Sequence, residues 1–254
     1  MVNMKKMLVG NWKMNPVSLK GAEKLFISSA KLISKIKKTE VVACPPFLYL
    51  NKLKKHSKKL GLGVQNISTE ESGAYTGEIS SEMVYDLGGR YAILGHSERR
   101  AMGENNEDVN KKIKRALSSG LIPIICIGEK NRDENHEYLN FIKEQLEVAF
   151  KNISKDSLAK IIIAYEPVWA IGKNAVREAT PEEFLETKIF IKKVLSSIFS
   201  VKTEMPRIIY GGSVHAKNSL FFLKEGQSDG FLVGRDRLDA KKFNEIINIT
   251  ENSF

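Results

Sequence analysis

Three side chains suited to proton transfer stand at the ends of separate short apolar segments. Glu166 ends one such segment, His96 follows another, and Lys13 comes shortly after a third. A carboxylate can act as a general base, while a neutral imidazole and an ammonium can stabilise charge that develops on a nearby oxygen. Brought together, the three groups would suit proton abstraction next to a carbonyl group.

Glycine-rich turns follow two more apolar segments near the end of the chain. Gly212 and Ser213 lie in the first turn, and Gly234 and Arg235 lie in the second. Free backbone N–H groups in such turns can form a nest for an anion. A phosphate charge 4 Å from Lys13 would gain up to roughly 4 kcal/mol at an effective dielectric of 20. The pattern therefore indicates a small phosphorylated substrate.

These residues need elements that bring them together, and the sequence predicts eight strands. The predicted strands are short, nearly continuous apolar runs, typical of strands buried on both faces: residues 7–11, 40–43, 63–66, 91–95, 122–127, 161–166, 207–211 and 230–233. Amphipathic helical segments alternate with them. One helix start is marked by Thr180 as N-cap, Pro181 at the first position and Glu183 completing a capping box.

Strand–helix alternation predicts parallel strands joined by right-handed crossovers. We expect residues 1–254 to form a single α/β domain, a (β/α)8 TIM barrel, because no linker divides the chain and its length suits one barrel. The alternative is an open doubly wound sheet, which usually carries a glycine-rich nucleotide-binding turn. The segment 61–63 lacks the third glycine of that turn, and the chain contains no P-loop.

The formal net charge of +10 allows a nucleic-acid partner, an anionic substrate or a lysine-rich surface. Lysines cluster at 35–38, 52–59 and 111–114 without interleaved aromatic residues, which favours a solvated outer face and no nucleic-acid partner. No apolar run reaches the roughly 18 residues of a membrane span. The apolar piece 7–9 is too short for the core of a signal peptide, so we expect a cytoplasmic protein with no membrane partner.

The cysteines and histidines of the chain, which are common metal ligands, do not indicate a metal site. Cys44 and Cys126 lie far apart, and the four histidines are scattered without metal-ligand spacing. Cys126 lies within an apolar run, and we expect its thiol to be buried. We therefore expect acid–base chemistry without a metal.

Several segments of the chain resemble the signatures of the triosephosphate isomerase family. These segments occur in the family's order between Met7 and about Ile247: residues 11–15 (NWKMN), 74–80 (AYTGEIS), 95–100 (GHSERR), 126–129 (CIGE), 164–172 (AYEPVWAIG) and 210–214 (YGGSV). The resemblance implies an isomerase that needs no cofactor or metal. Its reaction would interconvert dihydroxyacetone phosphate and D-glyceraldehyde 3-phosphate through an enediolate, in glycolysis and gluconeogenesis.

The resemblance also implies roles for individual residues. Glu166 would be the catalytic base and Lys13 a catalytic cation. His96 would be an electrophile kept neutral by a helix N-terminus, an arrangement for which this family is the standard example. The implied substrate-binding residues are Asn11, Lys13, Gly172, Ser213, Gly234 and Arg235, and the implied supporting residues are Ser97, Glu98, Tyr210 and Gly212.

Members of the family are usually homodimers in which a loop of one subunit inserts into the other. The resemblance assigns that loop to the segment around Thr76, and the sequence does not distinguish a dimer from a larger assembly. Two features depart from the family's pattern. The lid that starts at Pro167–Gly172 is two residues longer through Lys173–Thr180, and Arg235 stands where the family has a second glycine.

Two other functions stay open at the level of the sequence. The chain could be a different phosphate-binding barrel enzyme, such as an aldolase, which would need a Schiff-base lysine within a strand. It could also be a basic barrel that binds RNA without catalysis. The combination of Glu166, His96 and Lys13 favours the isomerase over both.

Overall fold

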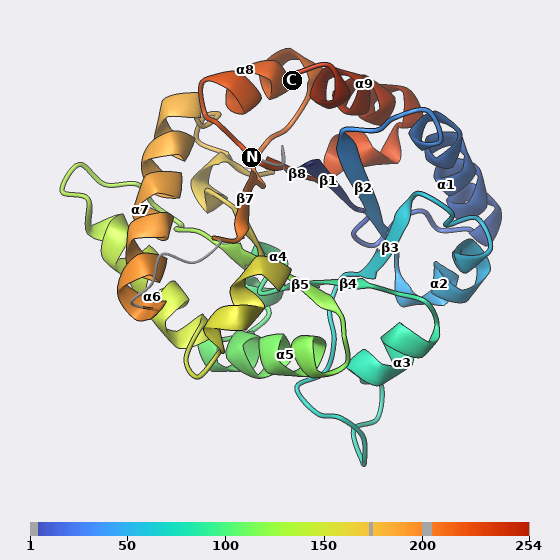
Figure 1. The fold of residues 1–254 in the computed structure, drawn as a ribbon, viewed down its shortest axis with the longest axis horizontal. Helices are drawn as coiled ribbons and strands as arrows, with labels where there is room; N and C mark the ends of the chain where they lie inside the picture. Colours follow the sequence, from blue (N-terminus) through green and yellow to red (C-terminus); the bar gives the residue numbers. More distant parts are fainter. Residues whose placement is uncertain (1–4, 173–174, 200–204, 254) are drawn as a thin grey trace.

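Eight parallel strands close into a barrel in chain order, and helices surround it (Figure 1). The computed structural model describes residues 5–172, 175–199 and 205–253. The strands are β1 Lys6–Asn11, β2 Thr39–Cys44, β3 Gly61–Val64, β4 Tyr91–Leu94, β5 Ile122–Ile127, β6 Ile162–Tyr165, β7 Arg207–Tyr210 and β8 Gly230–Val233. Because β1 pairs with both β2 and β8, the single-domain (β/α)8 barrel is confirmed and the open sheet is wrong.

The helices follow the strands and form the outer layer (Figure 1). The α-helices are α1 Leu19–Ile33, α2 Phe47–Lys54, α3 Ser81–Asp86, α4 Ser97–Ala101, α5 Asn106–Ser118, α6 Glu137–Ala149, α7 Pro181–Phe199, α8 Ala216–Lys224 and α9 Ala240–Glu251. Three short 3-10 helices accompany them: η1 Lys155–Lys160, η2 Val168–Ala170 and η3 Arg235–Leu238. In the described ranges, no helix combines the length and the apolar composition that a membrane crossing requires.

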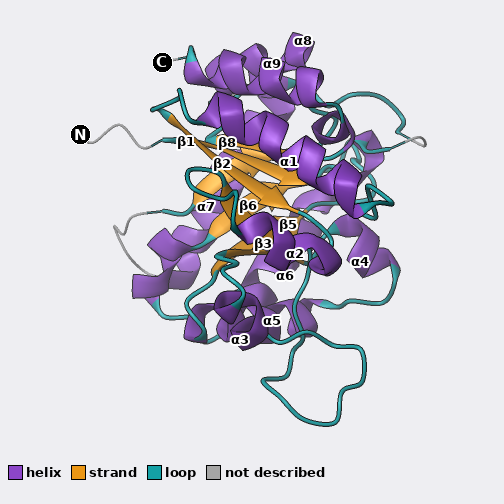
Figure 2. Cartoon of the chain, turned by 90° about the vertical axis from the view of Figure 1, so that its right-hand side faces the viewer, coloured by secondary structure: helices purple, strands orange, loops and turns teal. Residues whose placement is uncertain are grey.

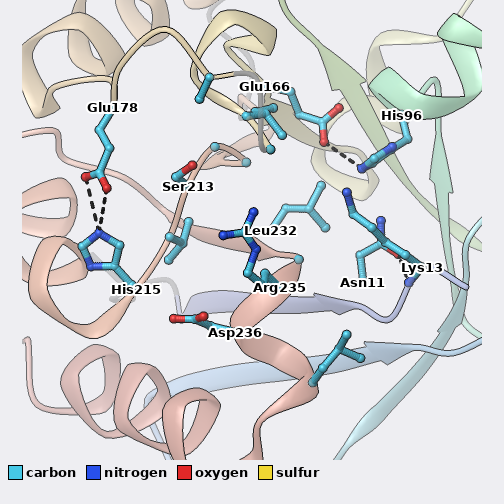
Figure 3. A pocket seen from close by; sticks show the side chains of 18 of the residues that line it. Asn11, Lys13, His96, Glu166, Glu178, Ser213, His215, Leu232, Arg235 and Asp236 are labelled. Carbon is cyan, nitrogen blue, oxygen red and sulfur yellow. Dashed lines mark hydrogen bonds and ion pairs between the residues drawn. The ribbon is translucent and has the colours of Figure 1, made fainter. Parts of the chain in front are cut away.

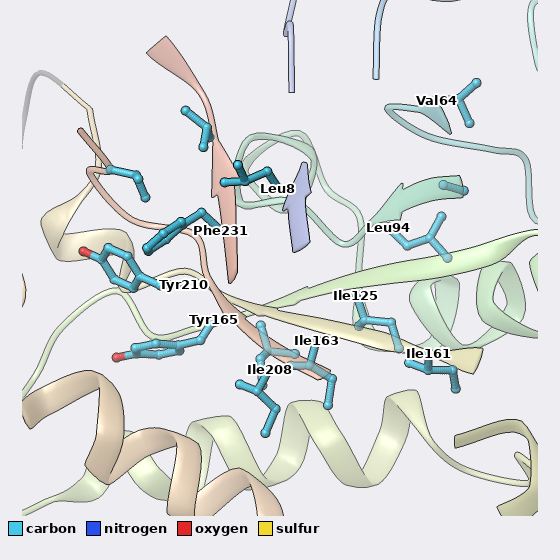
Figure 4. Close-up of a cluster of buried hydrophobic side chains, with 14 of the residues drawn as sticks. Leu8, Val64, Leu94, Ile125, Ile161, Ile163, Tyr165, Ile208, Tyr210 and Phe231 are labelled. Atoms are coloured by element: carbon cyan, nitrogen blue, oxygen red, sulfur yellow. The ribbon is translucent and has the colours of Figure 1, made fainter. Parts of the chain in front are cut away.

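Alternation along the strands creates two buried layers. On β1, Met7 and Val9 belong to a cluster inside the barrel, whereas Leu8 belongs to the larger cluster between the sheet and the helices. Figure 4 shows part of this outer cluster, to which Ile125, Ile163 and other strand residues contribute. The near-continuous apolar runs follow from this arrangement, since both faces of each strand are covered.

All eight predicted strands are present, with small shifts at their ends. The largest shift is in β3, which begins at Gly61 rather than at residue 63. A methyl group built on Gly63 would lie 2.8 Å from Sγ of Cys44 and 2.9 Å from Cβ of Tyr91. Glycine usually weakens a strand, but here close packing against two neighbours requires it.

The predicted start of α7 is confirmed, and one prediction about lysines is wrong. The Glu183 backbone N–H donates to Oγ1 of Thr180 (3.3 Å), and the Thr180 N–H donates to the Glu183 carboxylate (2.8 Å). Lys112, predicted on a solvated face, is instead buried in an ion pair with Glu104 and donates to Oδ1 of Asn66 (2.8 Å). This pairing depends on residues outside the helix of Lys112, so the helical pattern could not indicate it.

The segment between β3 and α3, which contains Thr76, projects beyond the ring of helices (Figures 1 and 2). Its turns use Gly73 and Gly77 at φ values of +122° and +91°, which L side chains rarely adopt. Tyr75, beside Thr76 in this segment, is half-exposed. The projecting segment therefore carries a large side chain that is only partly covered.

Candidate active site

A cavity of about 570 Å³ opens where the strands end, and polar side chains from several strands surround it (Figure 3). The sequence-predicted residues that line this cavity are Asn11, Lys13, His96, Glu166, Gly172, Gly212, Ser213, Gly234 and Arg235. They come together because the carboxyl ends of all eight strands meet at one face of the barrel.

Three predicted supporting residues lie just outside the cavity wall. Ser97 donates its backbone N–H to Oε2 of Glu166 (2.9 Å), and Glu98 forms an ion pair with Lys13. Tyr210 is fully buried, with its ring stacked on Phe222 at a centroid distance of 3.9 Å. Burial raises the pKa of Tyr210, and its hydroxyl has no hydrogen-bond partner in the described part of the chain.

His96 is positioned by the turn between β4 and α4. Gly95 has a φ of +68°, and a methyl group built on it would lie 2.9 Å from Val109, so this turn requires glycine. His96 caps α4, and its Nδ1 accepts the backbone N–H of Glu98 (3.1 Å). Since Nδ1 acts as an acceptor, the ring is neutral with its proton on Nε2. That nitrogen lies 3.1 Å from Oε1 of Glu166.

Glu166 is buried at the end of β6, and only 3% of its surface is exposed. Its backbone N–H donates to the carbonyl of Ile127 (2.7 Å). A methyl group built on Gly128 would lie 1.8 Å from the Glu166 carbonyl oxygen, and one on Gly211 would lie 2.9 Å from Cγ. Glycines on both neighbouring strands thus let the Glu166 backbone and side chain fit between them.

Lys13 has a φ of +51°, a conformation that favours glycine. Two side chains hold it there: Oδ1 of Asn11 accepts the Lys13 N–H (3.0 Å), and Nε2 of Gln65 donates to the Lys13 carbonyl (2.9 Å). Gln65 also donates to the carbonyl of Cys44 (2.9 Å). The sequence prediction did not include Gln65, because it placed this residue inside the predicted strand 63–66, whereas β3 ends at Val64.

The glycine-rich turns after β7 and β8 line the same cavity as Glu166, and Figure 3 shows Ser213 and Arg235 on them. Ser213 donates its hydroxyl to the carbonyl of Ala170 (2.9 Å), which joins the turn after β7 to the segment after β6. A methyl group built on Gly234 would lie 3.4 Å from Cε and 4.0 Å from Nζ of Lys13. The turn after β8 therefore lies directly against the lysine.

Comparison with known proteins now identifies the family. A family model described as "Triosephosphate isomerase" matches residues 6–250. The chain belongs to the triosephosphate isomerase family. Proteins named triosephosphate isomerase from Francisella philomiragia and Alkaliphilus oremlandii are similar to it, with 39% identity over 252 residues and 41% over 255. Each comparison covers 96% of this chain, and 97% and 99% of the two relatives. A third, from Endomicrobium trichonymphae, is 36% identical over 252 residues, covering 97% of this chain and 99% of that protein.

The buried carboxylate of Glu129 holds the segment after β6 in this member of the triosephosphate isomerase family. The sequence prediction did not include this residue. Glu129 accepts hydrogen bonds from the Tyr165 hydroxyl (2.8 Å) and from Nε1 of Trp169 (2.7 Å). Its backbone carbonyl accepts the N–H of Val168 (2.9 Å), and burial raises the pKa of its carboxyl. The signal was present in the matching segment 126–129, whose last residue is this glutamate.

The far end of the predicted longer lid is held by an ion pair and by a contact to a histidine. Arg177 lies over the Trp169 ring (4.6 Å to the centroid) and pairs with Glu183. Glu178 lies 3.2 Å from Nε2 of His215, in the turn after β7. Of the predicted lid Lys173–Thr180, Lys173 and Asn174 lie outside the described residues.

Across the described ranges, no group of three or more His, Cys, Asp or Glu side chains could hold a metal ion.

Proposed function

We propose that Glu166 and His96 carry out the proton transfers of the triosephosphate isomerase reaction in this chain. The activity is that of an intramolecular aldose–ketose isomerase, which interconverts dihydroxyacetone phosphate and D-glyceraldehyde 3-phosphate, and the family match and the names of the relatives support it. This activity accounts for the chain better than an aldolase or an RNA-binding barrel. The observation that carries the residue roles is the 3.1 Å approach of a neutral imidazole to a buried carboxylate.

In the forward reaction, the Glu166 carboxylate takes a proton from C1 of dihydroxyacetone phosphate, and the C–H electron pair moves to form the enediolate. The Nε2–H of His96 donates to the carbonyl oxygen where charge develops, and the Lys13 ammonium stabilises the same charge. Return of the proton from Glu166 to C2 completes the isomerisation. A neutral imidazole suits this step because it can donate a proton to one oxygen and accept one from the other.

Both oxygens of the Glu166 carboxylate have partners within the protein, one in Nε2 of His96 and one in the Ser97 N–H. A substrate carbon that approaches the carboxylate would compete with at least one of these two hydrogen bonds. We infer that substrate binding and reorientation of Glu166 occur together. Closure of the segment that follows Glu166 would then exclude water from the enediolate.

The phosphate group would lie among the glycine-rich turns. Gly172, Ser213, Gly234, Arg235 and Lys13 line the cavity, and backbone N–H groups of the first four would bind the phosphate. Gly172 has a φ of +81°, which orients its peptide group as only glycine does readily. Glu98, paired with Lys13, and Asn11, bonded to the Lys13 backbone, would keep the ammonium directed at the substrate.

Isomerisation of glyceraldehyde 3-phosphate in a coupled assay, with and without EDTA, tests the function. We expect rapid turnover that EDTA does not change. Absence of turnover from folded protein would reject the isomerase function, and turnover lost with EDTA would reject the metal-free mechanism. Borohydride treatment with substrate should trap no covalent adduct, whereas an aldolase-type lysine would form one.

We propose in addition that the chain forms a homodimer through the loop around Thr76. A second cavity of about 580 Å³ borders Asn11 and Lys13, and its rim carries strongly exposed apolar side chains. Met14, Leu48 and Met102 on this rim are 92%, 86% and 70% exposed. Large apolar side chains grouped in this way mark interaction surfaces. The projecting loop of a second copy, with Tyr75 beside Thr76, would cover them.

A cytoplasmic location is the environment we propose for this enzyme. Its two thiols, Cys44 and Cys126, are both free and buried, and burial raises the pKa of each. Buried, protonated thiols suit a reducing compartment where disulfides do not form. Fractionation of the source cells, with activity recovered outside the cytosolic fraction, would contradict this proposal.

A further inference from the structure

The ionisable side chains that line the active-site cavity share one property. With one exception, each lies within 4.0 Å of an acidic or basic partner: His96 with Glu166, Lys13 with Glu98, Arg177 with Glu183, Glu178 with His215, and Asp236 with Lys242. The exception is Arg235. No acid of the described chain lies within ion-pair distance of its guanidinium.

Arg235 follows Gly234 directly, in the turn that lies against Lys13. Its side chain projects into the cavity, as Figure 3 shows, on the side of the glycine-rich turns. Two cations thus face the same space. One is already paired with Glu98, and the guanidinium of Arg235 has no acid of the described chain within ion-pair distance. An anion that enters the cavity beside Arg235 would balance its charge.

We propose that the Arg235 guanidinium binds the phosphate dianion of the substrate directly, in addition to any contact from the backbone N–H of the same residue. The inference rests on the proposed function and assigns a second binding group to it. A guanidinium presents a planar fork of N–H donors that matches two phosphate oxygens, which an ammonium cannot do. Arg235 is exposed, so solvent will weaken the contact relative to a buried pair.

Phosphate is the non-reacting end of the substrate, and the proposed contact to it is one that would be equally strong before and during proton transfer. Loss of such a contact raises KM and leaves kcat nearly constant. We therefore expect Arg235→Met to raise KM for glyceraldehyde 3-phosphate by about tenfold, with kcat within about threefold of wild type. The inhibition constant of inorganic phosphate should rise by the same factor. Arg235→Lys should recover part of the loss, because it restores the charge without the fork.

Lys241→Met is the matched control, since it removes one exposed positive charge near the start of α9 that does not line the cavity. The control should leave KM and phosphate inhibition at wild-type values. If it weakened binding as much as Arg235→Met, net charge rather than a direct contact would be responsible, and the proposal would be wrong. Unchanged KM and phosphate inhibition in Arg235→Met, or a loss confined to kcat, would also overturn it.

Binding of inorganic phosphate by calorimetry separates this inference from the proposed function. If the wild-type protein had no isomerase activity, calorimetry would still show whether Arg235 contributes to phosphate binding. If Arg235→Met fails to fold by circular dichroism, Arg235→Gln removes the same charge with a polar side chain of similar length. Wild-type phosphate affinity in that variant would reject the contact.

Discussion

At the residue scale, the His96–Glu166 pair shows how a backbone hydrogen bond sets side-chain chemistry. The Glu98 N–H occupies Nδ1 of His96, so Nε2 must carry the proton, and this nitrogen faces Glu166. The start of α4 thereby determines which nitrogen of the imidazole can act as a donor. Glu166 itself is almost fully buried, so water does not compete for its oxygens.

Glu166→Ala removes the proposed base and leaves the glycine-rich turns in place. We expect turnover to fall by at least about 10²–10⁴, because this is the usual contribution of a positioned general base. Binding of inorganic phosphate should persist within about threefold. Steady-state kinetics and calorimetry on the same preparation check both parts, and turnover near that of wild type would reject Glu166 as the base.

Arg237 has a guanidinium that is fully buried with no hydrogen-bond acceptor among the described residues. Its charge lies 5.0 Å from the ring centroid of Trp12 and 4.5 Å from that of Phe243. Burial lowers the pKa of Arg237 from its usual 12.5 to about 9. Cation–π contacts therefore offset only part of the cost of removing this charge from water.

We expect Arg237→Met to raise the free energy of unfolding at pH 7 by about 1–3 kcal/mol, since a buried charge is replaced by an apolar chain of similar length. Below pH 9 both folded and unfolded wild type bind this proton, so the advantage of the variant is complete. Between the pKa of Arg237 in the folded state and 12.5, the folded state binds fewer protons than the unfolded state. The free energy of unfolding of the wild type therefore rises with pH in this range. The advantage should accordingly shrink between pH 8 and pH 10.5.

Urea unfolding of Arg237→Met and wild type across this pH range is the measurement. Arg90→Met is the control, because the exposed Arg90 guanidinium donates to the carbonyls of Tyr85 and Gly89 (2.9 and 2.7 Å). That variant should not gain stability. A loss of stability in Arg237→Met at pH 7 would mean that an acceptor such as a buried water satisfies the charge.

At the scale of elements, the segment between β6 and α7 is tied down at both ends. Glu129 holds its first part through the Tyr165 hydroxyl and the Trp169 indole, and the capping box of Thr180 and Glu183 fixes its last part. Ser213 joins it to the turn after β7. An enzyme with a longer lid can keep its active-site geometry when the added residues lie between such fixed points.

Thr180→Ala removes the side-chain acceptor at the start of α7. We expect it to lower the free energy of unfolding by about 1 kcal/mol, the usual cost of losing an N-cap hydroxyl. Ser196→Ala, on the exposed side of the same helix, should change stability by no more than about 0.5 kcal/mol. Urea titrations of both variants provide the comparison, and equal effects would show that the Thr180 cap contributes nothing specific.

At the scale of the whole molecule, one face of the barrel exposes a group of large apolar side chains. The exposed apolar rim of Met14, Leu48 and Met102 lies beside the cavity that borders Lys13. Since the φ of +51° at Lys13 depends on Asn11 and Gln65, contacts from a second subunit on this face would affect the position of Lys13. Assembly and activity should therefore be coupled.

Leu48→Lys places a charge on this apolar rim. We expect it to convert a dimer into a monomer at micromolar concentration, with a loss of activity of about tenfold or more as the support of Lys13 is removed. Sedimentation velocity measures the assembly state, and the isomerase assay measures the coupling. Phe221→Lys is the control, because Phe221 is 52% exposed on α8 and does not border the cavity. A wild-type protein that sediments as a monomer would reject the dimer.

The sequence by itself determined the barrel and the placement of its polar residues. Strands buried on both faces must be apolar along their length, so β1 to β8 could be located within about two residues from local pattern alone. Because parallel strands end at one face, residues such as His96 and Glu166 could be assigned to one site without any knowledge of distances. The capping box at Thr180 was equally local, since its donors and acceptors lie three residues apart.

Only the tertiary structure decided which groups contact one another across the closed barrel. The engagement of Glu166 by Ser97, the support of Lys13 by Gln65 and the burial of Arg237 all join segments distant in the chain. Such contacts depend on how strands and loops pack after closure, and no local period encodes them. The absence of an ion-pair partner for Arg235 among the described residues also depends on the tertiary structure, because it requires knowledge of all the groups that surround the side chain.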